Sequence, residues 1–142
     1  MTISTEPTPA VLLRGAATYI ETHGWHQGSR YDFTGELMPT PAACAVGALC
    51  IAAYGNVMAD LIHRPEPTPA QWQALVGVFR VFTDYLTDAD TPPVSPEDVD
   101  HVYEDIIGGW NDNPDRTAAD VTTALRVAAD RWGRLHPCGG VS

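Results

Sequence analysis

The residues best suited to covalent chemistry surround a cysteine near the predicted start of a helix. Cys44 lies in the first turn of the helix that we expect over residues 41–54, where unpaired N–H groups and the helix dipole lower the pKa of a thiol. A general base and a group to orient it are available from four further residues: His23, His26, Asn111 and Asp112. Such a set would make the protein a cysteine-dependent hydrolase or transferase. The alternative interpretation is a small buried residue within "AACAVGA".

Histidine spacing suggests a metal site as a second kind of chemistry. The H-x-x-H pair of His23 and His26 has a spacing typical of zinc ligands, and His136 with Cys138 would complete a set of four. The two pairs lie far apart in the sequence, and the C-terminal "HPCGGVS" has the composition of a flexible tail. We therefore predict neither a metal nor another cofactor.

Aromatic and polar side chains offer a third candidate, a small-molecule pocket. Such pockets combine aromatic walls with a few polar groups, and four residues have that character: Trp25, Gln27, Tyr31 and Trp110. The same side chains are suited to packing on a buried helix. Packing is the interpretation that we favour, because Trp110 continues the apolar stripe of its own predicted helix.

Acidic residues dominate the stretch between Arg80 and Arg116, which contains ten acids and no base. Four polar residues share the side of a predicted helix that is opposite its apolar stripe: Glu97, Asp100, His101 and Glu104. This face predicts binding to a protein with a basic surface, and a DNA-mimic inhibitor is a more specific alternative. The simplest alternative is an ordinary solvated surface.

The overall charge narrows the classes of function. The 142 residues include eighteen acids, eight arginines and no lysine, for a formal net charge of −10. This balance disfavours direct binding to nucleic acid, and the missing lysine excludes Schiff-base chemistry and a Walker-type phosphate loop. The sequence also lacks an apolar run of membrane-spanning length and the features of a signal peptide. We therefore expect a cytoplasmic protein that binds neither membranes nor nucleic acid, of undetermined oligomeric state.

Helix starts recur along the chain and position all of these residues. A hydroxyl N-cap is followed by proline at four places: Thr8, Thr40, Thr68 and Ser95. Thr117 adds a capping-box pattern. Five helices are predicted, at about 9–23, 41–54, 69–86, 96–109 and 118–133. The second is apolar on nearly every side and should be central and buried.

These elements predict a mainly α-helical protein with one globular domain over residues 1–142. We expect a compact bundle of about five helices around the buried helix 41–54. Alternating residues at 30–38 are compatible with a short β-hairpin. The ends, residues 1–7 and 135–142, are expected to form flexible tails.

Three motifs in a fixed order resemble an uncharacterised family. The segments "HGWHQG" at 23–28, "ACAVGAL" at 43–49 and "WNDNPDRT" at 110–117 are similar to H-G-W-x-Q-G, C-A-x-G-A and W-N-D-x-P-x-R-T. Those motifs belong to a bacterial and phage family known only as a domain of unknown function. The resemblance spans about residues 10 to 132 and implies no particular chemistry.

The leading functional hypothesis is a small acidic accessory or regulatory protein that acts by binding a partner. A phage origin would make a host protein the target. An enzyme that uses Cys44 is the alternative from a different class, and the accessibility of the Cys44 sulfur to a histidine distinguishes the two.

Overall fold

The computed structural model describes residues 8–32, 40–55, 66–88 and 99–136, with the side chains of 99–101 excepted. Five α-helices form the regular structure of these ranges: α1 (Pro9–His23), α2 (Ala45–Tyr54), α4 (Pro69–Thr87), α5 (Val99–Asn111) and α6 (Ala118–Leu135). The only β-pairing in the same ranges is two isolated bridges, which join Ala43 to Trp25 and to Tyr31. The expected mainly α-helical bundle is confirmed.

Side-chain caps begin three of the helices where the sequence predicts them. The Thr8 hydroxyl accepts a hydrogen bond from the Val11 amide at the start of α1. Thr68 and Thr117 each form a complete capping box at the starts of α4 and α6. Because these caps satisfy N–H groups that a helix cannot pair internally, the sequence fixes the three starts locally.

The predicted start of the second helix is wrong. This helix begins at Ala45, with Cys44 as its N-cap, and not at Pro41. The residues before it are extended, and Ala43 pairs with the backbone of both Trp25 and Tyr31. Long-range backbone pairing therefore replaces the first helical turn that the Thr40–Pro41 pattern predicts.

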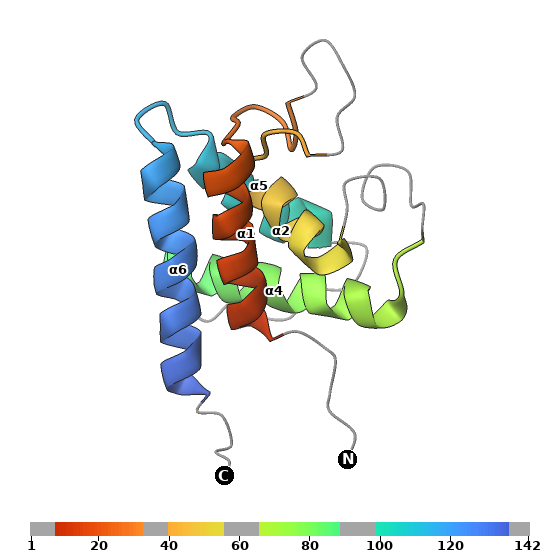
Figure 1. The fold of residues 1–142 in the computed structure, drawn as a ribbon. Helices are drawn as coiled ribbons and strands as arrows, with labels where there is room; N and C mark the ends of the chain where they lie inside the picture. The colour runs from red at the N-terminus through yellow and green to blue at the C-terminus, as the bar shows by residue number, and fades with distance from the viewer. Residues whose placement is uncertain (1–7, 33–39, 56–65, 89–98, 137–142) are drawn as a thin grey trace.

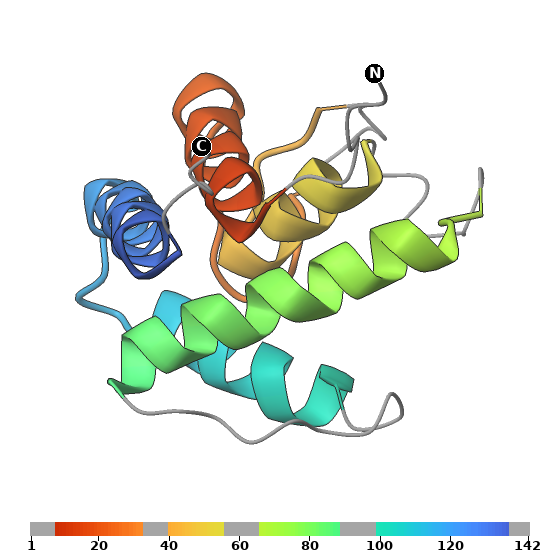
Figure 2. The same ribbon diagram turned by 90° about the horizontal axis from the view of Figure 1, so that it is seen from below.

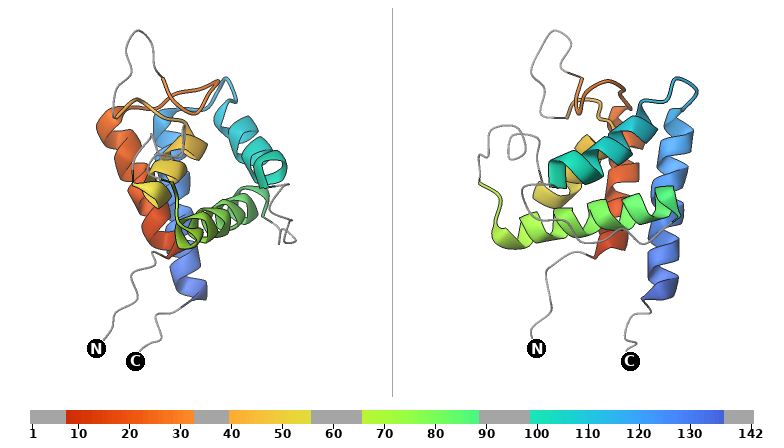
Figure 3. Two further views of the ribbon diagram at one scale, coloured as in Figure 1. Left: turned by 90° about the vertical axis from the view of Figure 1, so that its right-hand side faces the viewer. Right: turned by 180° about the vertical axis from the view of Figure 1, so that it is seen from behind.

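Helix α2 lies at the centre of the bundle. Helix α1 packs on one side of it and α5 on another, while α4 crosses beneath all three (Figures 1 and 2). Helix α6 lies beside α1 in the opposite direction, and both also contact α4 (Figure 3). Eight residues of α2 are buried, which confirms that this helix is enclosed.

The core draws large side chains from the other helices around α2. Among the most deeply buried are Leu13 of α1, Phe79 and Phe82 of α4, Tyr103 of α5 and Leu125 of α6. Burial of side chains of this size is the main favourable contribution to folding. Each surrounding helix is therefore held against the core by the apolar side chains along one of its faces.

Several sequence predictions concern residues outside the described ranges. These are the cap at Ser95, the tail residues 1–7 and 137–142, and most of the hairpin at 30–38. Helix α6 continues to Leu135 and is capped by His136, so the last helix ends later than predicted. Among the described helices, none has the length and apolar character needed to cross a membrane.

Candidate functional site: the Asn111 junction

The three motifs meet at one buried side chain. Asn111, the last residue of α5, has an exposed fraction of 0%. Its Oδ1 accepts hydrogen bonds from the indole Nε1 of Trp25 at 2.7 Å and from the amide of Ala45 at 3.0 Å. Its Nδ2 donates to the carbonyl oxygen of His26 at 3.1 Å and to Oδ1 of Asp112 at 3.0 Å. One amide thus joins the 24–28 segment, the start of α2 and the end of α5.

A second layer of bonds closes this junction on the outside. The Gln27 side chain donates to the carbonyl oxygens of Asn111 at 3.0 Å and Asn113 at 2.9 Å. The amide of Gly28, which has φ +96°, donates to Asp112 at 3.0 Å. We name this set of bonded groups around Asn111 the Asn111 junction. Its polar groups bond mainly to one another, which is the arrangement of a structural support.

Close backbone packing completes the junction at α2. A Cβ on Gly47 would lie 2.5 Å from the Arg30 carbonyl oxygen and 2.9 Å from the Tyr31 ring. The Tyr31 hydroxyl donates to the Gly47 carbonyl at 3.3 Å, and the Cys44 amide donates to the Arg30 carbonyl at 2.9 Å. Only glycine permits the 30–31 segment to approach α2 so closely.

The four proposed pocket residues contact two different sets of groups. Tyr31 is buried, while Trp25 and Gln27 bond to the Asn111 junction. Trp110 makes a different set of contacts: its ring meets Phe82 edge-on, with the ring centroids 5.7 Å apart. The Arg116 guanidinium lies 4.2 Å from the centroid of the Trp110 ring, and its Nε donates to the Trp110 carbonyl. The structure thus brings Trp25 and Gln27 together at the Asn111 junction and places Trp110 against Phe82 and Arg116.

Cys44 is enclosed at the start of α2. Its side chain is 5% exposed, and its sulfur accepts a hydrogen bond from the Gly47 amide at 3.3 Å. Burial raises the pKa of the Cys44 thiol, and the nearby carboxylate of Asp112 raises it further. Hydrogen bonds from the backbone of Gly47 and Val46 and the charge of Arg30 lower this pKa, but the effect of burial is larger. Desolvation therefore outweighs the helix N-terminus here.

The candidate bases for Cys44 contact other groups. The His23 ring packs against Tyr19, with the ring centroids 4.7 Å apart, and His26 Nε2 lies 3.0 Å from the Ser29 hydroxyl. The Asn111 amide, expected to orient a histidine, instead bonds to Trp25 and Ala45. The structure therefore brings Asn111 to the amide of Ala45, the residue after Cys44, where its side chain caps the start of α2.

Glu104 does not belong to an exposed acidic face. Its side chain is 14% exposed and forms an ion pair with Arg30. Both residues, together with Cys44, line a cavity of about 170 Å³, which is small for a ligand site. Asp100 and His101 belong to α5, but their side chains lie outside the described part of the structure, as does all of Glu97.

Two of the proposed metal ligands, His23 and His136, belong to the ends of different helices. His23 lies at the end of α1, and His136 follows the end of α6, where it stacks on Trp132 with a centroid distance of 4.4 Å. Cys138 lies outside the described residues. In the described ranges, no group of three or more His, Cys, Asp or Glu residues is arranged to hold a metal ion.

Comparison with known proteins identifies the family. The pattern of a family of unknown function, DUF6197, matches residues 4–131. The chain belongs to DUF6197. No curated protein and no solved structure matches it. All three segments of the Asn111 junction lie inside the part of the chain that matches DUF6197.

Sequence reasoning missed two connections in this DUF6197 protein. Arg30 was not singled out, although it holds Glu104 and its carbonyl contacts the start of α2. Gly47 carries no role in the sequence analysis, although a Cβ there would collide with Arg30. A glycine within an otherwise alanine-rich helix was the available signal, because glycine is unfavourable in a helix unless close packing requires it.

Proposed function

We propose that this DUF6197 protein is a small acidic accessory or regulatory protein that acts in the cytoplasm by binding another protein with a basic surface. The observation that supports binding over catalysis is that the motif side chains at the Asn111 junction form hydrogen bonds within the protein itself. Trp25, Gln27 and Asn111 bond to other parts of the same chain. We further propose a bacterial or phage origin, with a host protein as the target.

The surface charge supports a basic partner. The net charge of −10 comes without any lysine, and several arginines already serve internal contacts, such as Arg30 with Glu104 and Arg116 with Trp110. Asp105 of α5 and Asp115 of the following turn are exposed. A surface of this kind attracts a basic protein and accelerates its association.

The environment of Cys44 favours the hypothesis of a binding protein over that of an enzyme with a cysteine nucleophile. A nucleophilic thiol needs a lowered pKa and access to its substrate. Cys44 is 5% exposed, and burial raises its pKa. Both features are opposite to those that a reactive cysteine requires.

Affinity purification from the native host tests this proposal. The wild-type chain is compared with a double variant on α5, Asp100→Asn with Asp105→Asn, and with a matched double variant elsewhere, Glu66→Gln with Asp130→Asn. Glu104 is left unchanged because its ion pair with Arg30 is largely buried, whereas the pair of Asp130 with Arg14 is exposed and contributes little to stability. Each pair removes two negative charges.

We expect the wild-type chain to enrich one specific protein with a basic surface. The α5 variant should slow its association several-fold at about 0.1 M salt, where the Debye length is about 10 Å, and the difference should disappear near 1 M. The control variant should associate like the wild type. Enrichment of no specific protein, or a partner that binds the α5 variant as fast as the wild type at every salt concentration, would refute the proposal.

A further inference from the structure

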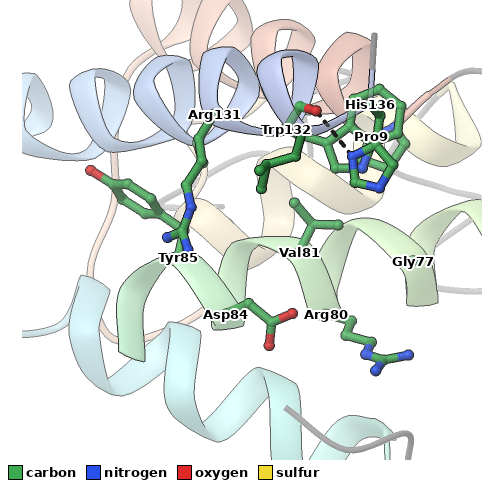
Figure 4. Close-up of a pocket in the computed structure, with 11 residues that line it drawn as sticks. Pro9, Gly77, Arg80, Val81, Asp84, Tyr85, Arg131, Trp132 and His136 are labelled. Atoms are coloured by element: carbon green, nitrogen blue, oxygen red, sulfur yellow. Dashed lines mark hydrogen bonds between the residues drawn. The ribbon is translucent and has the colours of Figure 1, made fainter. Parts of the chain in front are cut away.

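A cavity between α4 and α6 has no role in the Asn111 junction. Its volume is about 400 Å³, within the range of small-molecule sites. The residues that define its character are Gly77, Val81 and Tyr85 of α4, with Arg131, Trp132 and Leu135 of α6. Figure 4 shows Val81 between Arg131 on one side and the Trp132–His136 pair on the other.

Apolar and aromatic groups form one part of this cavity. Trp132 is stacked with His136 at an interplanar angle of 12°, and His136 Nδ1 lies 3.0 Å from the Trp132 carbonyl oxygen. Leu135, at the edge of the cavity, is 67% exposed, the highest value among the exposed large apolar residues of the described ranges. A flat apolar molecule placed over Val81 would cover these groups and remove apolar surface from water.

Gly77 keeps the α4 side of the cavity open. Glycine in a helix interior is less favourable than alanine, and a Cβ on Gly77 would meet no atom within 4 Å. Packing within the described structure therefore does not require this glycine. A side chain at this position would instead occupy space that the cavity provides.

Arg131 gives the cavity a cationic group that is held loosely. The distance from its Nη1 to Oδ1 of Asp88 is 3.9 Å, and the two side chains are 41% and 93% exposed. An ion pair that is long and exposed contributes little, so another anion can replace Asp88 at low cost. By contrast, Arg14 and Arg126 lie 2.9 and 2.6 Å from their carboxylate partners.

We propose that this cavity binds a small organic anion with a planar apolar body. The body lies over Val81 against Trp132, and the anionic group replaces Asp88 at Arg131. Arg80 and Asp84 of α4 also line the cavity. This site is separate from the protein-binding surface of α5 and does not depend on it.

Two fluorescent probes with the same aromatic body test the proposal. The anion is 8-anilinonaphthalene-1-sulfonate, and the neutral counterpart is N-phenyl-1-naphthylamine. We expect the anion to bind the full chain at one saturable site and more tightly than the neutral probe. Binding of several anions per chain without saturation, or tighter binding of the neutral probe, would overturn the proposal.

Charge variants identify the group that recognises the anion. Arg131→Gln should weaken binding of the anionic probe by roughly two- to fivefold at low salt, a range typical of an exposed charge contact, and leave the neutral probe unchanged. Asp88→Asn removes the competing carboxylate, and asparagine tolerates the left-handed conformation of Asp88, which has φ +53°. It should therefore strengthen binding of the anion. Equal binding of the anion by the wild type and both variants would refute the role of Arg131.

A filling variant identifies the cavity itself. Gly77→Met places a flexible side chain in the cavity and should abolish saturable binding of both probes, with the melting temperature kept at or above that of the wild type. Gly109→Met is the matched control, because Gly109 is also helical and open but lies on α5. Retained binding in a folded Gly77→Met variant would show that the probes bind elsewhere and would overturn the proposal.

Discussion

The Asn111 amide supplies an acceptor and two donors to groups from separate segments of the chain. An aspartate at this position lacks the donors, and a leucine of similar volume lacks both kinds of group. The four hydrogen bonds of the Asn111 side chain are between 2.7 and 3.1 Å long. A buried polar network that is fully bonded specifies one arrangement of its segments, so Asn111 fixes how α5 meets the start of α2.

Removal of this amide should destabilise the protein strongly. Asn111→Ala leaves the indole N–H of Trp25 and the amide of Ala45 without their acceptor, and each unpaired buried donor costs about 1 to 3 kcal/mol. We expect a loss of about 2 to 4 kcal/mol in the free energy of unfolding, measured by urea denaturation. The matched control, Asn113→Ala, removes an exposed side chain that accepts from the Asp115 amide and should cost less than about 1 kcal/mol. Equal losses in the two variants would contradict a central role for Asn111.

The sequence predicts which residues belong to the site better than it predicts what those residues do. The motifs indicated Cys44, Asn111 and Trp25, and in the structure Asn111 bonds to Trp25 and to Ala45, the residue after Cys44. Their roles depend on which groups are buried, and a single sequence does not show burial. Desolvation therefore reversed the expected direction of the Cys44 pKa.

For the helices, the sequence predicts the first residue correctly where the capping hydrogen bond joins residues within one turn. Thr8, Thr68 and Thr117 cap helices as predicted because the bond partners lie three residues away. The pattern at Thr40 and Pro41 is the same, yet the chain is extended there because Ala43 pairs with distant backbone. Long-range pairing of this kind overrides local propensity and leaves no periodic signal in the sequence.

Helix α2 should tolerate no side chain where it meets the 30–31 segment. Gly47→Ala places a Cβ 2.5 Å from the Arg30 carbonyl oxygen, and overpacking of this kind costs about 1 to 3 kcal/mol. Gly109→Ala is the matched control, because a Cβ there would meet nothing within 4 Å, and it should stabilise the protein by about 0.5 to 1 kcal/mol. Chemical denaturation measures both changes. A Gly47→Ala variant as stable as Gly109→Ala would mean that the approach of Arg30 to α2 is not tight.

At the scale of the whole molecule, ion pairs and net repulsion act against each other. The α1–α6 contact carries two cross-helix pairs, Arg14 with Asp130 and Arg126 with Glu21. Their side chains are about half exposed, and exposed pairs contribute less than about 1 kcal/mol each. The eighteen acids and eight arginines leave a net charge of −10, whose self-repulsion opposes the compact state.

The repulsion is the larger effect, so sodium chloride should stabilise the protein. Salt screens both contributions, but the whole excess of ten acids is crowded between Arg80 and Arg116, whereas the pairs are few and exposed. Between about 0.02 and 0.5 M NaCl we expect the melting temperature to rise by roughly 2 to 5 °C, as a gain of about 1 kcal/mol would produce in a domain of this size. Sodium chloride is preferable to sulfate, which stabilises proteins by exclusion from their surface. A variant with three exposed acids neutralised, Glu66→Gln, Asp105→Asn and Asp115→Asn, should show a higher melting temperature at low salt and a smaller rise with salt. A melting temperature that falls as salt is added would show instead that the ion pairs between α1 and α6 outweigh the repulsion.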